Sequence, residues 1–352
     1  MKNTSKLAAS ILSRREFVGG LAIAAGAGVI APTLLGGAAF AQSPKPNSLI
    51  RGVQIGVITY SFRSMPDQSA QALLRYCIES GVSAIELMGD PAEVFAGLPP
   101  NPNAERLRKV RTRDAMTNAP PLIAEEQKEK AEVMAAMAVY QKQTSAWRAT
   151  AQMPKFVELR KLFNDAGVSI YGFKPSAFEV SSTDAEIDYG MRAAKALGAS
   201  HVTVELPTDT AHAARLGAAA LKHGILVGYH QHLQATPTLW DAALTASKGN
   251  GINLDLGHFT AAGEYDGVAF MRNHADRITS MHLKDRRTKS NGQANLPWGT
   301  GDTPVVAALK TMRDQKFRFP ATIELEYDIP AGSDAVKEVR KCLDYCRKAL
   351  EA

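Results

Sequence analysis

Short apolar runs alternate with amphipathic stretches along the chain from residue 51 onward. The runs have the length of strands, and the stretches between them repeat their apolar positions with the period of a helix. The predicted strands are 53–60, 82–88, 168–173, 201–206, 225–230, 251–256, 278–284 and 321–327. The clearest predicted helices are 69–80, 184–197, 210–223 and 334–350. Eight repeats of strand and helix are typical of an α/β protein with a single (β/α)8 TIM barrel, here over residues 51–350.

The alternative to a closed barrel is a doubly wound open sheet. No G-x-G-x-x-G motif follows the first predicted strand, which weakens the nucleotide-binding form of that alternative.

The regular alternation breaks once, after the second strand. About 80 residues separate that strand from the third, where one helix would be enough. Residues 91–121 are rich in Pro and Asn and contain a basic run at 106–113, and 124–140 predicts a helix. We therefore expect a long insertion at 89–150. It is either a solvated excursion or an active-site lid, since long loops after barrel strands lie over the active site.

The first 41 residues have the pattern of an export signal. Residues 13–18 read S-R-R-E-F-V, which resembles the twin-arginine motif, and an uncharged stretch rich in Ala and Gly follows at 19–39. The small-x-small sequence at 39–41 predicts cleavage before Gln42. We expect a periplasmic protein with no membrane segment in its mature form. A retained membrane anchor is the alternative, although the stretch is weakly hydrophobic.

Composition and charge exclude several classes of protein. The chain has 352 residues, of which 45% are hydrophobic and 22% charged, as in ordinary globular proteins. The net charge is +6, and half of it falls in residues 1–41, so the remainder gives no reason to expect a nucleic-acid or membrane-surface partner. Three cysteines are too few for a disulfide scaffold or a Cys-based zinc site. We expect Cys77, Cys342 and Cys346 to be buried thiols, with a bridge from Cys77 as the alternative.

Polar side chains share one parity on several predicted strands. Successive strand residues alternate between the helices and the barrel interior, and the apolar set must face the helices. The polar set facing inward, on several strands near the C-terminal end, comprises Glu86, Lys174, His201, Glu205, His230, His232, Asn253, Asp255, His282, Lys284, Glu324 and Glu326. Unpaired charges there would cost several kcal/mol each. One divalent metal ion would satisfy them, and a nitrogen and oxygen ligand set without thiolate suits Mn²⁺, Mg²⁺, Co²⁺ or Zn²⁺.

Five segments are informative together: G-Y-H-Q-H at 228–232, N-L-D-L-G-H at 253–258, M-H-L-K-D at 281–285, G-T-G-D at 299–302 and I-E-L-E-Y at 323–327. In their order and spacing they resemble the xylose isomerase-like TIM-barrel family, which contains sugar phosphate isomerases and epimerases. The resemblance implies a TIM barrel whose strands five to eight hold one metal with Glu, Asp, His and Glu. It also implies that the two Glu move a proton on either face of a sugar carbon next to a carbonyl.

The resemblance assigns roles position by position. Asp255, His282 and Glu324 match three of the metal ligands, and His258 matches a substrate-binding histidine. His230 stands where the epimerases have the fourth ligand, a Glu. The second proton carrier would then be His230 itself or the neighbouring Glu205.

The full set of expected site residues follows. The metal ligands are His230, Asp255, His282 and Glu324, with His232 and Glu326 as substitutes for the first and last. The catalytic residues are Glu324, His230 and Glu205. The substrate-binding candidates are His258, His232, Lys174, Lys284, Glu86 and Trp298; the two lysines could instead form ordinary ion pairs, and Trp298 could serve packing.

These residues predict a metal-dependent sugar isomerase or epimerase that acts by proton abstraction next to a carbonyl. One alternative is a metal-dependent lyase or hydratase on a 3-keto sugar or keto-glycoside, since loss of a β-substituent can follow the same first step. A second alternative is a non-catalytic sugar-binding barrel. The expected partner is a small carbohydrate, and the resemblance suggests a homo-oligomer.

Overall fold

The structure is a computed structural model that describes residues 45–114 and 121–352. The predicted export signal at 1–41 lies outside these residues. The described residues belong to one compact unit. In the described part of the chain, no helix combines the length and the apolar character needed to cross a membrane.

Eight parallel strands close into a barrel, as predicted. In chain order they are β2 (Val53–Ile58), β3 (Ala84–Met88), β4 (Ser169–Lys174), β5 (His201–Glu205), β6 (Leu226–His230), β7 (Asn250–Asp255), β8 (Ile278–Leu283) and β11 (Ala321–Ile323). Each pairs with the next, and the pairs β11–β2 and β2–β3 complete the ring. The short β1 (Leu49–Ile50) runs antiparallel to β2, and β9 (Asp285–Arg286) pairs with β10 (Asn295–Leu296) in a separate hairpin.

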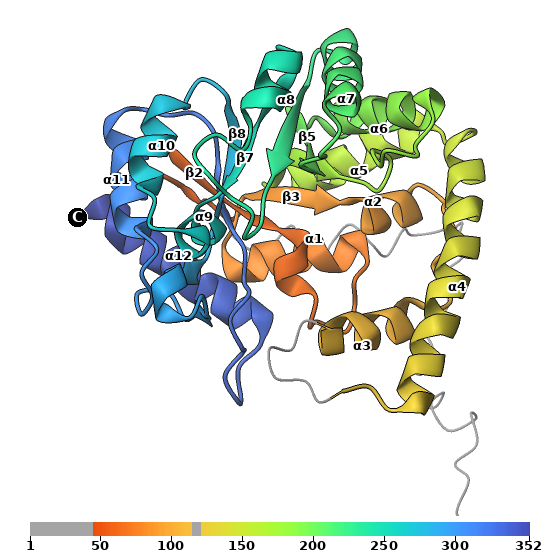
Figure 1. The fold of residues 1–352 in the computed structure, drawn as a ribbon, viewed down its shortest axis with the longest axis horizontal. Coiled ribbons are helices and arrows are strands. Elements are labelled where there is room, and N and C mark those ends of the chain that lie inside the picture. Colours follow the sequence, from red (N-terminus) through yellow and green to blue (C-terminus); the bar gives the residue numbers. More distant parts are fainter. Residues whose placement is uncertain (1–44, 115–120) are drawn as a thin grey trace, which may run out of the picture. The chain divides into compact units, whose positions relative to one another are not determined.

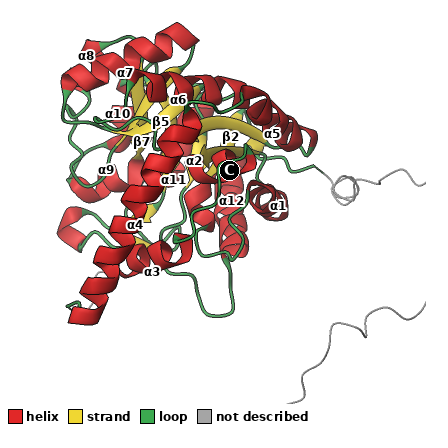
Figure 2. Ribbon diagram, turned by 90° about the vertical axis from the view of Figure 1, so that its right-hand side faces the viewer, coloured by secondary structure: helices red, strands yellow, loops and turns green. Residues whose placement is uncertain are grey.

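Helices surround the strands on all sides (Figure 2). They are α1 (Ala70–Ser80), α2 (Gly89–Phe95), α3 (Ala104–Asp114), α4 (Ala124–Arg148), α5 (Met153–Asp165), α6 (Asp184–Leu197), α7 (Thr210–His223), α8 (Asp241–Ala246), α9 (Leu256–Ala262), α10 (Gly267–Asn273), α11 (Val305–Asp314) and α12 (Ala335–Glu351). Local signals set their ends. Thr183 and Glu186 form a capping box at the start of α6, and Gly198 ends it with φ 81°, a conformation that favours glycine.

The first and the last predicted strands extend beyond the observed strand ends. The first ends at Ile58 and continues as a 3-10 helix, η1 (Thr59–Phe62), and the last ends at Ile323. The Ser61 hydroxyl explains both corrections, because it donates to the carbonyl of Ile323 at 3.1 Å and accepts from the amide of Leu325 at 3.0 Å. A side chain thus replaces the backbone partner that a continued ladder would need.

The alternation of outward and inward residues follows the prediction. Apolar residues such as Val202, Ile252 and Leu254 are fully buried between strands and helices. The inward set includes His201, Asn253 and other buried polar residues, which bond to one another across the barrel. The barrel interior is therefore a polar network enclosed in an apolar shell.

The insertion after β3 contains α2, α3 and α4, so the predicted helix at 124–140 continues to Arg148. Figure 1 shows α4 as a long column at one edge of the molecule, with α3 beside it. A buried ion pair anchors its end: the Arg148 guanidinium donates to both Glu93 carboxylate oxygens at 2.8 and 3.1 Å. Tyr189 also donates to Glu93 at 3.0 Å. These contacts fix α4 against α2 and α6, and a lid role stays a prediction.

The cysteines are buried free thiols, as expected. Cys77 lies on α1, and Cys342 and Cys346 lie on α12, which packs against it.

We expect Arg148→Met to destabilise the protein by about 3–5 kcal/mol, because it leaves the Glu93 carboxylate buried without its counter-ion. Urea denaturation measures the loss. Lys155→Met is the matched control, since the Lys155–Glu158 pair is more than half exposed and should be worth less than about 1 kcal/mol. Equal losses in the two variants would show that the buried pair does not anchor the insertion.

Candidate active site

Four predicted ligands meet at the C-terminal ends of four adjacent strands. His230 ends β6, Asp255 ends β7, His282 lies in β8 and Glu324 follows β11. Their nearest side-chain nitrogen and oxygen atoms all lie within 4.8 Å of one another, and all four residues are buried. The C-terminal face of a barrel is where catalytic residues of this architecture gather.

Asp255 is held by the backbone amide of His258 and by the side chain of Gln231. Its Oδ1 accepts a hydrogen bond from the amide of His258 at 2.7 Å and so caps the N-terminus of α9. The Gln231 amide bonds to both the carbonyl and the amide of Asp255, at 2.7 and 3.1 Å. The other carboxylate oxygen, Oδ2, is buried and makes no hydrogen bond. It points toward the other three predicted ligands; the four residues His230, Asp255, His282 and Glu324 are called the cluster below.

Lys284 places an ammonium group among the carboxylates. Its Nζ lies 2.9 Å from Asp255 Oδ2, 3.0 Å from Glu324 Oε2 and 2.8 Å from Glu326 Oε2. The Asp255 contact is an ion pair without hydrogen-bond geometry. Burial opposes the charge on Lys284, but the three carboxylates outweigh burial and raise its pKa. These contacts are ion pairs, and substrate binding by this lysine stays a prediction.

His282 lies between two carboxylates, Glu324 after the neighbouring strand β11 and Glu86 on β3. Its Nδ1 is 2.7 Å from Glu324 Oε2, and its Nε2 is 3.0 Å from Glu86 Oε2. Burial favours the neutral ring, but the two carboxylates outweigh it and raise the pKa of His282 to about 10. Glu86 was expected to contact substrate; instead it lies fully buried behind His282, whose charge lowers the pKa of Glu86 to about 2 against the effect of burial.

His230 is a neutral histidine with one free nitrogen. Its Nδ1 is 2.8 Å from the side-chain oxygen of Asn253, an acceptor, so Nδ1 carries the proton. Its Nε2 keeps a lone pair and lies 3.9 Å from Asp255 Oδ2. Burial, followed by the positive charges of Lys174 and His282, lowers the pKa of His230 to about 3. This is the protonation state that a metal ligand requires.

A second polar group lies at the rim of the barrel. Glu205 accepts from Lys174 Nζ at 2.7 Å and pairs with His232 Nε2 at 3.1 Å. His232 and Lys174 lower the pKa of Glu205 against partial burial, while the hydrogen bond that His232 donates to Glu205 raises the pKa of His232. The side chains of Glu205 and His232 are each 53% exposed. They can therefore reach a molecule that enters the mouth of the barrel.

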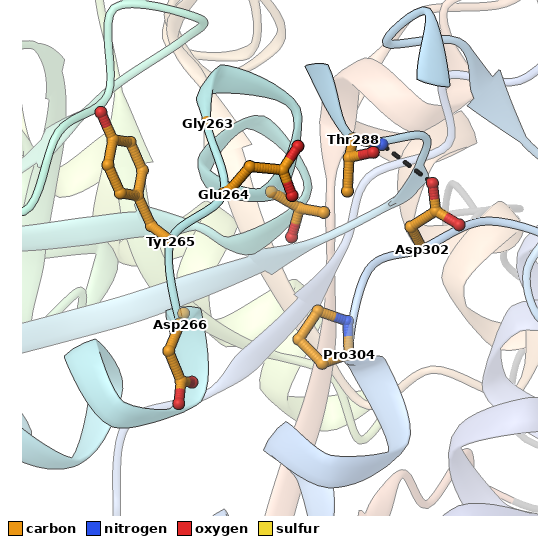
Figure 3. A pocket seen from close by; sticks show the side chains of 9 residues that line it. Gly263, Glu264, Tyr265, Asp266, Thr288, Asp302 and Pro304 are labelled. Atoms are coloured by element: carbon orange, nitrogen blue, oxygen red, sulfur yellow. Dashed lines mark hydrogen bonds between the residues drawn. The ribbon is translucent and has the colours of Figure 1, made fainter. Parts of the chain in front are cut away.

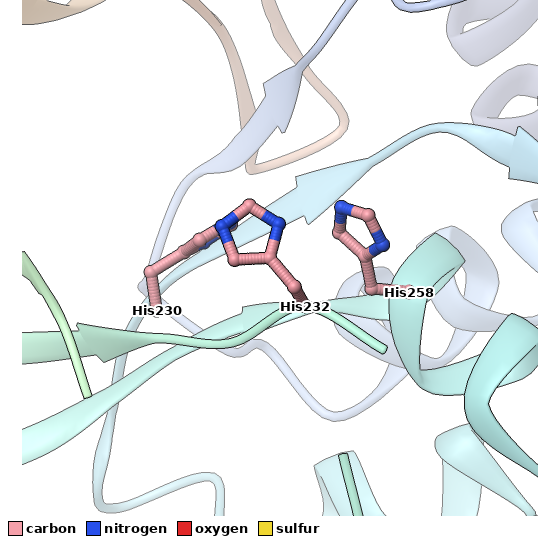
Figure 4. Close-up of side chains that lie close together, drawn as sticks. All are labelled: His230, His232 and His258. Carbon is pink, nitrogen blue, oxygen red and sulfur yellow. The ribbon is translucent and has the colours of Figure 1, made fainter. Parts of the chain in front are cut away.

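Three histidine rings form a second candidate group that shares His230 with the first (Figure 4). His232 extends from the loop after β6, and His258 from the first turn of α9. Their ring centroids are 4.8 Å apart. His258 Nδ1 lies 2.7 Å from Nη1 of Arg286. Sequence reasoning missed Arg286, which lies on β9 just beyond the M-H-L-K-D segment.

Comparison with known proteins supports the fold and the family. The profile described as "Xylose isomerase-like TIM barrel" matches residues 131–348. This chain belongs to that family. No curated protein sequence matches the chain at a significant level.

Several solved structures share the fold at low sequence identity. A xylose isomerase domain protein from Alicyclobacillus acidocaldarius has 16% identity and a TM-score of 0.55, with 85% of this chain and 99% of that one covered. The probable 3-DHS dehydratase of petrobactin synthesis from Bacillus anthracis has 14% identity and a TM-score of 0.54 over 83% and 97%. D-psicose 3-epimerase from Clostridium cellulolyticum, solved with D-tagatose, has 12% identity and a TM-score of 0.53 over 85% and 100%.

Two further features of this xylose isomerase-like barrel lie apart from the cluster. Trp298 packs edge-on against Tyr345 of α12, with ring centroids 6.0 Å apart, which corresponds to the packing alternative. A surface hollow of about 320 Å³ lies between the α9–α10 turn and the segment around Thr288 and Asp302 (Figure 3). None of the four clustered ligands lines it.

Because His201 is held neutral in the folded protein, it should make the stability of the fold depend on pH. His201 is buried between the hydroxyls of Ser200 and Ser280, each 3.0 Å from a ring nitrogen, and burial lowers its pKa to about 4. The unfolded chain binds a proton near pH 6.5 and the folded chain does not, so stability falls between pH 6.5 and about 4.

We expect His201→Gln to flatten the pH dependence of stability in that window, by at most about 1.4 kcal/mol per pH unit. Urea denaturation of both proteins at intervals from pH 8 to 4.5 measures the difference. Between pH 7 and 8 the difference should stay constant, which serves as the internal control. Parallel curves over the whole range would mean that His201 is not held neutral.

Proposed function

We propose that this protein is a metal-dependent enzyme that isomerises or epimerises a sugar by removing a proton from the carbon next to a carbonyl group. The single observation that carries this proposal is the buried group of His230, Asp255, His282 and Glu324, whose ligand atoms lie within 4.8 Å of one another. We also propose export to the periplasm, on the sequence of residues 1–41.

The donor set fits one divalent metal ion. Asp255 Oδ2 is a buried oxygen without a hydrogen bond, and His230 Nε2 offers a lone pair beside it. His282 would bind through Nδ1 after losing a proton, with its Nε2–H still donated to Glu86, an arrangement that orients a metal-binding histidine. Two imidazoles and two carboxylates suit Zn²⁺, Co²⁺ or Mn²⁺, and less well Mg²⁺.

The ammonium of Lys284 and the metal ion would compete for the same two carboxylates. Lys284 lies closest to Glu326, so a small movement of its side chain toward Glu326 would free Asp255 and Glu324 while keeping the lysine paired. A metal bound at this site supplies Lewis acidity, which polarises a substrate carbonyl and stabilises the negative charge that develops next to it.

The chain's own residues supply the proton transfers. Lys284 and His282 lower the pKa of Glu324 against its burial, which favours the ionised carboxylate that can accept the proton from carbon. His232 is the complementary acid, because its bond to Glu205 favours the protonated ring and its side chain is exposed to an entering ligand.

Elimination is the second candidate reaction, and His230 is the observation that favours it. Epimerisation with two glutamates needs a second carboxylate at this position, whereas His230 is neutral and bonded to Asn253. In elimination, Glu324 takes the α-proton, the bond from the β-carbon to oxygen breaks, and the departing oxygen takes a proton from His232. The product contains a new carbon–carbon double bond and no oxidant is required.

We expect about one Zn, Co or Mn per chain in protein purified without chelator, and its loss in Asp255→Ala. Elemental analysis measures the metal content. Asp266→Ala is the matched control, because Asp266 also caps a helix, α10, away from the cluster. If Asp255→Ala and Asp266→Ala retain the same metal content as the natural protein, the cluster does not bind the metal.

Turnover in D₂O separates the two reactions. We expect a panel of ketoses and 3-keto-glycosides to yield either an isomer that has gained one deuterium on carbon or an unsaturated product that has lost its β-substituent. Glu324→Gln should lower kcat by about 10²–10⁴, as loss of a general base does. Mass spectrometry and NMR identify the product, and absence of turnover on the whole panel with the metal-loaded protein would contradict both reactions.

Lys284→Met should destabilise the metal-free protein by about 3–5 kcal/mol, because it leaves Asp255 buried without its ammonium partner and Glu324 with His282 as its remaining cation. Saturating Zn²⁺ should restore most of that loss, since the ion replaces the missing charge. Thermal unfolding with and without Zn²⁺ measures both effects. A loss that Zn²⁺ does not reverse would show that lysine and metal do not share the carboxylates.

A further inference from the structure

The contact between His258 and Arg286 fixes where the histidine carries its proton. Nη1 of Arg286 lies 2.7 Å from Nδ1 of His258. A guanidinium has hydrogen-bond donors and no acceptor, so Nδ1 must be the acceptor and cannot carry hydrogen. A ring whose Nδ1 accepts a hydrogen bond from a guanidinium is a neutral imidazole. The one remaining ring proton is therefore on Nε2.

That Nε2–H group is a donor without a partner inside the site. His258 is 6% exposed, and its Nε2 is a buried atom that makes no hydrogen bond in the described structure. It lies 3.9 Å from Asp255 Oδ2, next to the four clustered ligands. A buried donor left unpaired costs about 1–3 kcal/mol, so the arrangement points to a ligand atom that completes it.

Arg286 is itself held rigidly, so the choice of tautomer is built into the fold. Its Nε and Nη2 both donate to the carbonyl of Gln293, at 3.2 and 2.7 Å. Gln293 has a positive φ of 59° and donates from its side chain to the carbonyl of Ala261 at 2.6 Å. The loop between β9 and β10 is thereby tied to the end of α9, the helix that carries His258.

We infer that Arg286 is a positioning residue that keeps the proton of His258 on Nε2, so that His258 donates a hydrogen bond to a substrate oxygen beside Asp255 and does not bind the metal. The substrate class rests on the proposed function: an oxygen that gains negative charge, such as the carbonyl oxygen of a keto-sugar during proton abstraction. A donor aimed at such an oxygen stabilises the transition state more than the ground state.

The inference also distinguishes between the two overlapping candidate groups. His230 has its proton on Nδ1 and a free lone pair on Nε2, whereas His258 has the opposite arrangement. His258 therefore cannot complete a metal site with His230 and His232 while Arg286 holds it. The metal would belong to the group that contains Asp255, His282 and Glu324.

Long-range ¹H–¹⁵N NMR of histidine-labelled protein reads the tautomer directly, and the chain has eight histidines. His258→Gln assigns the resonance. We expect a single Nε2–H tautomer in the natural protein and in Arg286→Lys, and appearance of the Nδ1–H form in Arg286→Gln, whose amide oxygen can accept. Arg287→Gln is the control, since Arg287 pairs with Asp302 and should leave the spectrum of His258 unchanged. An Nδ1–H or doubly protonated His258 in the natural protein would overturn the inference.

Addition of Zn²⁺ tests the second half of the inference on the same sample. The ion should shift the resonances of His230 and His282 and leave the Nε2–H correlation of His258 in place. Loss of that correlation on metal binding would contradict the inference. If Zn²⁺ shifts no histidine, the metal part of the proposed function fails, while the tautomer experiment still decides the role of Arg286.

Kinetics on the ketose identified by the D₂O panel measures the consequence. Arg286→Gln should lower kcat by up to about 10²–10³, the effect of losing one donor to a developing oxyanion, with KM little changed, and Arg286→Lys should recover most of it. In a His258→Ala background the Arg286→Gln change should cost nothing more, because both act through one hydrogen bond. A further loss there would mean that Arg286 acts independently of His258.

Discussion

The burial of carboxylates at the mouth of the barrel is the constraint on which the rest of this site depends. Glu86, Asp255 and Glu324 are all less than a tenth exposed. Each would cost several kcal/mol if it stayed charged without compensation. The protein supplies two compensating cations of its own, the His282 ring and the Lys284 ammonium, and their positions define where a divalent ion would have to bind.

The same barrel sets three histidines in three different states through their partners. The two carboxylates beside His282 favour the charged form of its ring. His230 donates a hydrogen bond from its Nδ1–H to the side-chain oxygen of Asn253 and keeps a lone pair facing the cluster. His258 accepts from Arg286 and keeps a donor facing the same cluster. Neighbouring imidazoles can thus serve as metal ligand and as substrate donor without exchanging roles, because each role is fixed by a hydrogen bond on the far side of the ring.

Much of this arrangement follows from periodicity. The eight strands and the inward parity of His230, Asp255 and His282 are consequences of a period of two under an apolar shell, and the sequence alone predicts them. The last strand stops at Ile323 because of the Ser61 hydroxyl, a tertiary contact with no local signal. The alternation along a strand predicts which face a side chain occupies, but not how deep in the barrel it lies. It therefore places Glu86 in the interior but not on the far side of His282.

The sequence does not predict which charged residues of distant segments pair with each other, for a related reason. Arg148 and Glu93 meet because the insertion folds back on the rim, and Arg286 reaches His258 because a short hairpin follows β8. A long cationic side chain can reach partners in several directions, and the folded arrangement determines which partner it meets. Lys284 illustrates this well: its sequence position allowed a substrate contact or an ion pair, and the barrel brings it to three carboxylates at once.

Anomalous diffraction from crystals soaked with Mn²⁺ or Zn²⁺ tests the central claim most directly, because it shows the position of the ion and its ligands together. The account predicts one strong peak about 2.0–2.3 Å from atoms of His230, Asp255, His282 and Glu324, with Lys284 turned toward Glu326. A peak elsewhere, or an ammonium of Lys284 still lying between Asp255 and Glu324 with no ion beside it, would contradict the account.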